Sequence, residues 1–382
     1  MSNNKTTIFI SGDFASFFRV RETIDKGDYQ VLYNEMLIVI KEADIRITNL
    51  EVPLLDNGNP IPKTGPNLKS PTKTIEAIKY ANFDMVTLAN NHAMDFGGDG
   101  LLSTIKLCEA NGIRHIGAGA NLEEAKKIQY FDINGSRVAF INCCENEWST
   151  THGDEAGCNP MDEVSLYYQI KEAKSNANHV IMIVHGGHET YDYPSPRMKR
   201  LYRWFIDIGV DSVIGHHTHC FSGYEIYKGK PVVYSLGNFV FDDRPRNSSW
   251  NIGAAALLTI DKENIYLKLL PYRQGDKEVG VVLFDENEEK QWLEKEQVRT
   301  EQIQDDEILG RKFKEFIAIQ ERLYRSYLEP NRSRWILFAK NHGFLPRKIK
   351  GLKRLQFLNI IRGEAHRDII LDILSREDSK SK

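Results

Sequence analysis

Histidines gather in three short stretches of this 382-residue sequence. The chain has 11 histidines, and six lie in these stretches: His92, His185, His188, His216, His217 and His219. Carboxylate and amide residues stand in the same stretches or in similar ones: Asp13, Glu51, Asn90, Asn91, Asp95, Glu189 and Asn238. A lone histidine is most often an ordinary polar residue. Imidazoles gathered with carboxylates and amides instead form a ligand set for divalent metal ions. The residue types therefore favour a metal site over a structural coincidence.

These stretches follow runs of β-branched residues that predict strands. Seven such runs occur, at residues 6–11, 45–49, 84–88, 137–142, 180–184, 211–214 and 231–236. Helices are predicted between several of them, at 31–42, 71–81, 100–111, 161–175 and 196–208. Alternating strands and helices indicate a layered α/β fold, whose ligands bind at the carboxyl ends of the strands. Six of the runs therefore deliver polar residues toward one rim.

Two local patterns bear on how these residues converge. In His217-Thr218-His219, an extended loop would point both imidazoles to the same side. Glycines flank the polar stretches, at Gly186, Gly187, Gly215 and Gly237. They allow either a close approach of the backbone or an ordinary turn, and the sequence does not separate the two.

The pattern changes near residue 252. Residues 254–260, 265–270 and 279–284 predict consecutive strands, as at an antiparallel edge. From Glu286 onward the sequence is helical and charged, with breaks at Pro330 and Pro346. We therefore expect two parts, a domain over 1–285 and a helical, basic C-terminal extension over 286–382.

Charge is distributed unevenly along the chain. Residues 311–382 carry 18 Lys and Arg against 8 Asp and Glu, a net charge of +10, whereas the whole chain has a net charge of −3. The densest basic stretch is 347–354. It is either a solvated helix face or a surface for an anionic partner such as lipid head groups.

Other chemistries are weaker in this sequence. No P-loop, dinucleotide fingerprint or nucleophile elbow occurs. The five cysteines show no C-x-x-C spacing, and Cys143-Cys144 is better explained by buried thiols than by a nucleophile pair. Trp148 and the aromatic residues Tyr191 and Tyr193 could line a groove or pack in the core. The start lacks a signal-peptide pattern and no run is long enough to span a membrane, so a cytoplasmic protein is expected.

Six ordered motifs carry a family resemblance: GD at 12–13, NLE at 49–51, LANNHAMDFG at 88–97, HGGHE at 185–189, GHHTH at 215–219 and SLGNFVFD at 235–242. Over residues 6–285 the chain resembles the CapA family of poly-γ-glutamate capsule biosynthesis, which is similar to calcineurin-like metallophosphoesterases. The alternation of predicted strands and helices alone would favour a doubly wound sheet. The resemblance implies instead a metallophosphatase-like, four-layer β-sandwich flanked by helices, and we adopt that expectation.

The resemblance also implies roles for individual residues. The metal ligands would be Asp13, Glu51, Asn91, His185, His217 and His219. His92 would be the catalytic histidine, with Asp95 and Glu189 orienting imidazoles or supplying a base. His188 and His216 have no firm counterpart in the family pattern. Asp13 is followed by Phe14-Ala15 rather than by the usual x-His, and Glu51 replaces an aspartate. These departures favour one firmly held ion, or a harder, oxygen-rich pair such as Mn²⁺, Mg²⁺ or Ca²⁺. The expected cofactor is therefore one or two divalent ions, Mn²⁺, Mg²⁺, Ca²⁺ or Zn²⁺.

Three functions follow from the resemblance. The first is a metal-dependent enzyme that makes or processes poly-γ-glutamate or a related anionic polymer. The second is a phosphoesterase acting on a small phosphate ester. The third is a non-catalytic accessory of capsule assembly or export, working with capsule-synthesis proteins. A peripheral membrane contact through the basic extension is expected, and a nucleic-acid partner is not.

Overall fold

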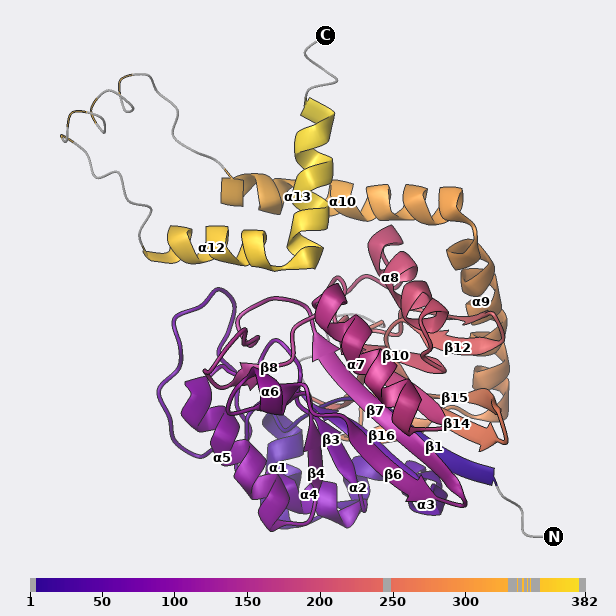
Figure 1. Ribbon diagram of the computed structural model, residues 1–382. Helices are drawn as coiled ribbons and strands as arrows, with labels where there is room; N and C mark the ends of the chain where they lie inside the picture. The colour runs from indigo at the N-terminus through magenta and orange to yellow at the C-terminus, as the bar shows by residue number, and fades with distance from the viewer. Residues whose placement is uncertain are drawn as a thin grey trace.

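The computed structural model describes residues 5–242, 249–328 and 351–377, with the single positions 335, 339, 342 and 344. It is a mixed α/β protein, which confirms the predicted class (Figure 1). Residues 347–350 of the basic stretch and both predicted helix breaks, Pro330 and Pro346, lie outside the described residues. Among the described residues, no helix combines the length and the apolar character needed to cross a bilayer.

Two large sheets form the centre of the molecule. The first has the order β16 (Val281–Leu283), β15 (Asn264–Gln274), β14 (Ile252–Asp261), β1 (Lys5–Ala15), β2 (Ile45–Leu50), β3 (Met85–Thr87) and β4 (Arg114–Ile116), and β13 (Asn238–Phe241) also pairs with β1. The second has the order β11 (Tyr224–Tyr227), β12 (Lys230–Val233), β10 (Ser212–His216), β9 (His179–His185), β7 (Ser136–Cys144) and β6 (Gln129–Ile133). A small ribbon joins β5 (Ala118–Gly119) to β8 (Gly157–Cys158).

The two sheets face each other across a shared apolar core. Alternate residues of a strand point to opposite faces, so Ile8 and Ile10 of β1 lie in this core while Phe9 packs on the outer side. In β9, Ile181 points to the shared core and Met182 points outward. Strands buried on both faces explain the near-continuous apolar runs of the sequence.

Helices cover the outer faces of both sheets. Against the first sheet lie α1 (Phe18–Lys26), α2 (Gln30–Tyr33), α3 (Met36–Glu42), α4 (Thr74–Tyr80) and α5 (Gly97–Ala110). The short α6 (Leu122–Ala125) packs on the small ribbon, and α7 (Glu163–Asn176) and α8 (Pro196–Asp207) cover the second sheet. The order of layers is therefore helix, sheet, sheet, helix.

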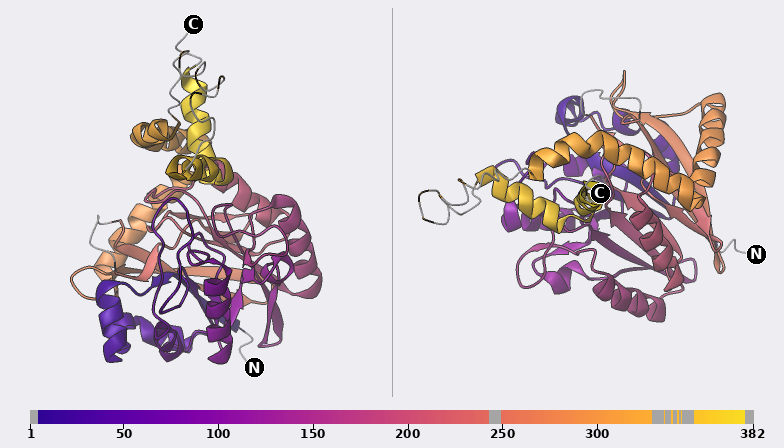
Figure 2. Two further views of the ribbon diagram at one scale, coloured as in Figure 1. Left: turned by 90° about the vertical axis from the view of Figure 1, so that its left-hand side faces the viewer. Right: turned by 90° about the horizontal axis from the view of Figure 1, so that it is seen from above.

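The chain after the last strand is helical. A capping box at Asp285 and Glu288 starts α9 (Glu286–Gln304), which runs along β11 and packs Trp292 against Phe221 at 4.9 Å between ring centroids. Helices α10 (Asp306–Leu328), α12 (Gly351–Arg362) and α13 (Glu364–Glu377) lie over one end of the two sheets (Figures 1 and 2). They share a small apolar core of their own, which includes Ile317 and Ile369 and which Tyr191 of the body joins.

Several elements differ from the sequence expectation. The single helix predicted over 31–42 is two helices, α2 and α3, because Asn34 between them has a positive φ of 46°. The predicted strand 231–236 ends at Val233 as β12. Helix α1 and the short strands β4, β6, β11 and β13 were not predicted. Helix α1 buries only Val20 and Ile24, and the strands are too short to show a period.

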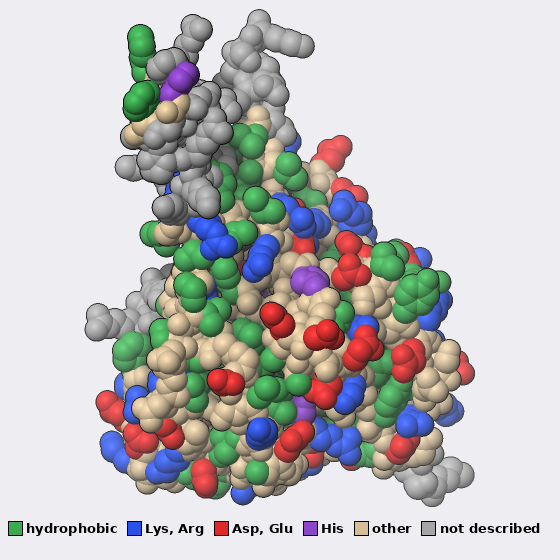
Figure 3. Space-filling view, turned by 60° about the vertical axis from the view of Figure 1, so that its left-hand side comes forward, with side chains coloured by type: hydrophobic (Ala, Val, Ile, Leu, Met, Phe, Trp, Pro, Cys, Tyr) green, Lys and Arg blue, Asp and Glu red, His purple; other side chains and the backbone are tan. Residues whose placement is uncertain are grey.

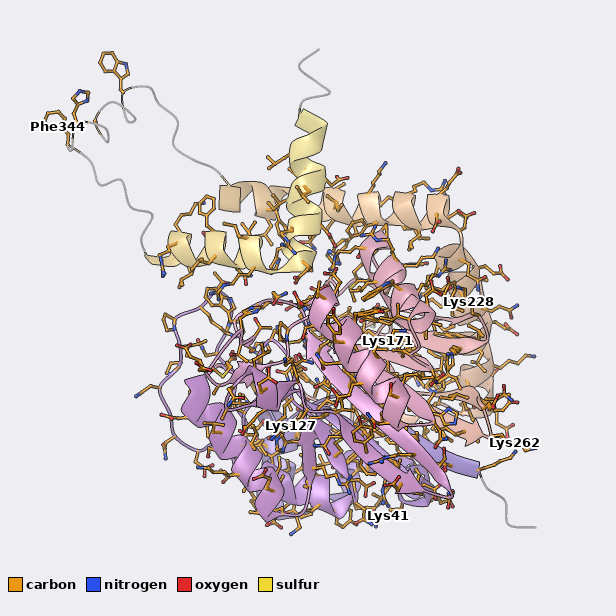
Figure 4. The ribbon with its side chains drawn as sticks, viewed as in Figure 1. Lys41, Lys127, Lys171, Lys228, Lys262 and Phe344 are labelled. Carbon is orange, nitrogen blue, oxygen red and sulfur yellow. The ribbon has the colours of Figure 1, made fainter. Side chains whose placement is uncertain are left out.

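Charged side chains are spread over the surface of the sandwich. Figure 3 shows acidic and basic side chains intermixed on one face of the body. The lysines labelled in Figure 4 on the body, Lys41, Lys127, Lys171, Lys228 and Lys262, lie at scattered outer positions. On the face drawn in Figure 3, the described residues of the body therefore form no concentrated basic patch.

Candidate metal centre

Parallel strand register brings the predicted site residues to one end of the two sheets. Asp13 of β1 is in register with Asn49 of β2 and with Asn238 of β13. In the second sheet, His185 of β9 is in register with His216 of β10. This is the end that α10, α12 and α13 cover (Figure 1). The structure thus places the ends of five strands around one small volume.

Asp13, Glu51 and His219 form what we call the acid–histidine cluster. Each offers one ligand atom, and these three atoms lie within 4.8 Å of one another. All three residues are buried. Asp13 Oδ2 and both carboxylate oxygens of Glu51 have no hydrogen-bond partner among the described residues. Buried carboxylate oxygens without donors are costly unless a cation pairs with them, so the donor set fits a divalent ion.

A second group of predicted ligands lies beside the first. His185 Nε2 is 3.0 Å from Asn91 Oδ1 and 3.2 Å from His217 Nδ1. Asn49 links the two groups, since its Nδ2 donates to Asp13 Oδ1 at 2.7 Å and lies 3.4 Å from His185 Nδ1. Asn49 stood in the NLE motif but was not among the predicted ligands, and its role here is to hold Asp13.

The loop after β10 reaches the cluster in an unexpected way. His217 and His219 have positive φ angles of 97° and 59°. The loop is therefore not extended as predicted, and both imidazoles turn inward through a left-handed backbone, with ring centroids 6.4 Å apart. Non-glycine residues rarely adopt this conformation, and such strain is concentrated at functional sites. His219 Nδ1 lies 2.9 Å from Asn238 Oδ1, which leaves Nε2 facing Glu51 Oε1 at 3.6 Å.

The glycines before these loops differ in what they do. A Cβ at Gly215 would lie 2.0 Å from the carbonyl oxygen of Tyr234, so only glycine allows β10 to approach that chain. Gly237 has a φ of +76°, which favours glycine at the turn into β13. The close approach of the backbone at Tyr234 therefore explains Gly215, and the geometry of the turn explains Gly237.

The electrostatic environment of the cluster suits a bound cation. Burial opposes ionisation of Asp13, but a hydrogen bond and the charges of His216, His185 and His219 hold its pKa well below the ordinary value. Burial and the negative charge of Asp13 raise the pKa of Glu51 well above its ordinary value. For His185, burial and the neighbouring histidines lower the pKa, which favours the neutral imidazole that ligates metals.

His92 belongs to a separate hydrogen-bonded group. Its Nδ1 lies 2.7 Å from Asp95 Oδ2, and Asp95 also accepts from the backbone N–H of Leu68 at 2.6 Å. Lys63 forms a buried ion pair with Asp95, and its Nζ lies 3.3 Å from His92 Nδ1. Burial lowers the pKa of His92. With Nδ1 engaged by Asp95, Nε2 is the ring nitrogen left for a ligand.

Lys63 and Glu147 are residues that the sequence analysis missed. Lys63 lies in the loop between β2 and α4, where no strand or helix pattern marked it. Glu147 follows β7, and its Oε1 is 4.0 Å from His217 Nε2. Burial raises the pKa of Glu147 to about 7. The predicted Glu189 is exposed and forms no hydrogen bond or ion pair with another described residue.

His188 is not part of the metal centre. Its Nε2 lies 3.0 Å from the carbonyl oxygen of Ala365 in α13, and its ring packs against Phe313 at 5.1 Å. Burial lowers the pKa of His188 to about 3. Tyr191 stacks on Phe316 at 4.4 Å, so this aromatic residue packs against the extension. The second histidine without a firm counterpart, His216, is buried with its Nδ1 3.2 Å from Asp13 Oδ1.

The adjacent cysteines fit the structural interpretation. Cys143 and Cys144 are fully buried in β7. Burial raises the pKa of the Cys143 thiol. The pKa of the Cys144 thiol is raised first by a hydrogen bond with Cys158 and then by burial. These are inert thiols rather than nucleophiles.

A cavity of about 530 Å³ lies above the centre. Its floor, contributed by the body, includes Lys63, Asn91, His92, Glu147, Glu189 and His217. Its roof, contributed by α10, α12 and α13, includes Phe316, Gln320, Tyr324, Gln356, Asn359 and His366. Of the six predicted metal ligands, Asn91 and His217 line the cavity, while Asp13, Glu51, His185 and His219 are buried and do not. Trp148 lines it as well and donates from Nε1 to Thr64 Oγ1 at 3.3 Å.

Comparison with known proteins covers the body of the molecule. Residues 7–243 match the sequence profile of the family described as bacterial capsule synthesis protein PGA_cap. The capsule biosynthesis protein CapA of Bacillus anthracis is 32% identical over 249 residues, which are 63% of this chain and 61% of that protein. The PGA biosynthesis protein CapA of Bacillus subtilis (strain 168) is 34% identical over 189 residues, or 48% of this chain and 50% of that protein.

A third relative has a different kind of name. A protein of Mycobacterium tuberculosis (strain ATCC 25618 / H37Rv), named a probable polyglutamine synthesis accessory protein, is 26% identical over 232 residues, or 56% of this chain and 60% of that protein. The chain thus spans about half to three fifths of the length of the curated relatives it matches. All six predicted metal ligands fall within residues 7–243, and the roof of the cavity falls outside.

Proposed function

Since the chain belongs to the bacterial capsule synthesis protein PGA_cap family, we propose that it is a metal-dependent enzyme that makes or processes poly-γ-glutamate or a related anionic polymer. The supporting observation is the acid–histidine cluster, in which three buried ligand atoms lie within 4.8 Å and three carboxylate oxygens lack donors among the described residues. The names of the Bacillus relatives support the polymer as substrate.

Asp13, Glu51 and His219 would hold the ion, with His185, His217 and Asn91 completing the set beside them. When bound, the ion would polarise a carbonyl or phosphoryl oxygen and lower the pKa of a bound water. The two sheets flanked by helices, with these residues at one end, support a metallophosphatase-like fold. Although Asp13 lacks a histidine two residues later, His216 at the end of β10 and His219 in the loop after it bring imidazoles to its carboxylate.

The chain's own residues supply the proton chemistry. Asp95 accepts from His92 Nδ1, which fixes the ring, and its hydrogen bond and negative charge oppose the lowering of the His92 pKa by burial and so favour the imidazolium. In that form Nε2 carries a proton that it can give to a leaving group at the floor of the cavity. Lys63 balances the charge of Asp95 and is the only lysine or arginine among the described residues that line the cavity. We propose that His92 is the general acid and that Asp95 and Lys63 position it.

A second candidate function is non-catalytic. The accessory name of the Mycobacterium tuberculosis relative favours it. In that case the metal centre would stabilise a surface for capsule-synthesis partner proteins, and His92 would be dispensable. A phosphoesterase acting on small esters uses the same residues, and turnover of a phosphate ester without any effect on the polymer would select it.

Elemental analysis of the purified full chain tests the metal centre first. We expect near-stoichiometric divalent metal in the wild type and its loss in the His217→Ala/His219→Ala double variant. His179→Ala is the matched control, because this buried histidine lies at the opposite end of β9 and its Nε2 lies 2.8 Å from the carbonyl oxygen of Lys262. Absence of metal from the wild type after supply of Mn²⁺, Mg²⁺, Ca²⁺ and Zn²⁺ would overturn the proposal and favour the accessory role.

The enzymatic part is tested on the metal-loaded protein with poly-γ-glutamate. A change in polymer length, measured by gel filtration and abolished in the double variant, supports the enzyme. A metal-loaded wild type that leaves the polymer unchanged and releases phosphate from esters contradicts the polymer and supports a phosphoesterase.

A further inference from the structure

The cavity is assembled from two separate parts of the chain. Its floor lies within residues 7–243, the range that matches the family. Its roof comes from α10, α12 and α13, which lie beyond that range (Figure 2). The candidate ligands therefore lie within the range that matches the family, whereas the opposite wall of the cavity is built by the extension of this chain.

Polar contacts fix the roof in place over the floor. The Glu364 carboxylate accepts from the backbone N–H of Asn146 at 2.9 Å and from Asn146 Nδ2 at 2.8 Å. Arg197 donates from Nε to Asp368 at 2.7 Å and also pairs with the buried Glu145. These contacts tie the first turns of α13 to the loop that carries Glu147 and Trp148. In the folded structure these contacts hold the roof over the floor of the cavity.

The roof offers amides and apolar surface rather than charge. Phe316, Ile360 and Ile369 supply apolar area. Gln320 of α10 and Gln356 of α12 are half-buried at the cavity wall, and neither forms a hydrogen bond with another described residue. A half-buried amide without a partner is a free donor and acceptor for a ligand.

Other polar groups of the roof are already engaged with one another. Asn359 Nδ2 lies 2.8 Å from His366 Nε2, and the Tyr324 hydroxyl lies 2.6 Å from His366 Nδ1. This chain of contacts crosses from α10 to α12 and α13. It holds the two helices that carry Gln320 and Gln356 at a set separation, so the two glutamine amides face the cavity from defined positions.

We propose that the extension is the specificity-determining wall of the site, with Gln320 and Gln356 hydrogen-bonding the main-chain amides of a short chain end. This rests on the proposed function, which supplies a polymer of glutamate as ligand. The charged groups lie on the floor and the amides on the roof, so the reacting end meets the floor while neutral amide and methylene parts meet the roof. A cavity of about 530 Å³ has the size of a small-molecule site and takes a few units rather than a long polymer.

Calorimetric titration of the full-length, manganese-loaded protein tests this proposal. The probes are γ-linked glutamate oligomers of one, three, six and twelve units. We expect the affinity to rise up to a few units and then to level off. Gln320→Leu and Gln356→Leu should each weaken binding of the three-unit oligomer about 5- to 10-fold, with unchanged metal content. Gln297→Leu, on the exposed side of α9, is the control and should bind as the wild type does.

The possible outcomes distinguish failure of the proposal about the roof from failure of the proposed function. Oligomers that bind the wild type and both roof variants equally overturn the roof's role and leave the proposed function standing. Affinity that keeps rising to twelve units overturns the selection of short ends. No binding of any oligomer to the metal-loaded wild type overturns the polymer as ligand and the proposal with it. Gln356→Glu is a second variant if the leucine variants unfold, because a carboxylate at this position should repel the same probe.

Discussion

His188 Nε2 lies 3.0 Å from the carbonyl oxygen of Ala365. One histidine of the HGGHE motif is thus bonded to the extension, while the first histidine of the same motif, His185, lies among the predicted metal ligands. The segment that carries this motif therefore connects the candidate metal centre to the roof of the cavity. The consequences of this arrangement can be tested at several points.

Glu51→Gln should separate metal binding from stability. The Glu51 carboxylate is buried with no donor among the described residues, so in metal-free protein it is a cost to folding. We expect manganese affinity to fall at least 100-fold, while the melting temperature of EDTA-treated protein stays the same or rises. Glu225→Gln is the control, because Glu225 accepts from Arg203 and Tyr234, and it should lose stability but keep its metal. Loss of stability in metal-free Glu51→Gln would contradict this assignment.

His92→Ala should lower turnover of the polymer by about 10²- to 10⁴-fold, the usual contribution of a general acid. Asp95→Asn should lower kcat by a smaller factor, because it disturbs the orientation of the His92 ring rather than removing it. Steady-state kinetics with metal content measured in parallel checks both values. Wild-type turnover by His92→Ala would remove His92 from the mechanism and favour the accessory role.

Arg197→Met should destabilise the protein by about 3 kcal/mol, because it leaves the buried Glu145 and the neighbouring Asp368 without their common cation. Urea unfolding of the full chain measures the change. The comparison is Lys228→Met, which removes an exposed ion pair with Asp207 and should have no measurable effect. Equal stability of Arg197→Met and wild type would mean that the three residues do not act as a unit.

Glu296 should make stability depend on pH. Burial raises the pKa of Glu296 to about 7. The positive charges of Arg299 and Lys295 lower this pKa, and the negative charge of Asp192 raises it. The folded state then binds more protons than the unfolded state between the ordinary glutamate pKa and about 7, so this group lowers stability as pH rises through that interval. Glu296→Gln should remove the loss, and its melting temperature relative to wild type should be higher at pH 8 than at pH 5. The opposite trend would show that the ion pair with Arg299 dominates.

The basic extension should bind anionic membranes weakly and through charge. The motivation is the net charge of +10 over residues 311–382. Vesicles with acidic lipids should sediment the protein at low salt and release it at about 1 M salt, where the screening length is only about 3 Å. Vesicles of neutral lipid are the control. Binding that persists at high salt, or that never occurs, would contradict an electrostatic contact.

The convergence of the candidate ligands at one end of the sheets could be predicted from the sequence better than their surroundings could. Asp13 and His185 lie near the carboxyl ends of β1 and β9, and Asn91 follows β3. Parallel register brings such strand ends together without any knowledge of the loops. Lys63 was missed because it lies in a long loop, where neither period nor spacing marks a residue. Its place is set by the tertiary contact with Asp95.

The position of the extension is the feature of the fold that could least be predicted from the sequence. Its helices could be predicted from their charged, periodic sequence, but their position could not. The contacts that seat α13 join residues far apart in the chain, such as Asn146 with Glu364 and Arg197 with Asp368. No local pattern reports such pairs. The same reason explains why the contact of His188 with the carbonyl oxygen of Ala365 could not be predicted from the sequence.

The small core of the extension bears on how a ligand reaches the cavity. Among the described residues it consists of eight buried side chains, whereas the cores between the two sheets and beneath their outer helices are much larger. Regions with few buried apolar contacts open at a fraction of the global unfolding free energy. Helices α10, α12 and α13 should therefore detach as one cooperative unit while the sandwich stays folded. Amide hydrogens of these helices should exchange together and ahead of those of β1 and β9, and local unfolding would then serve as the route by which the site fills and empties.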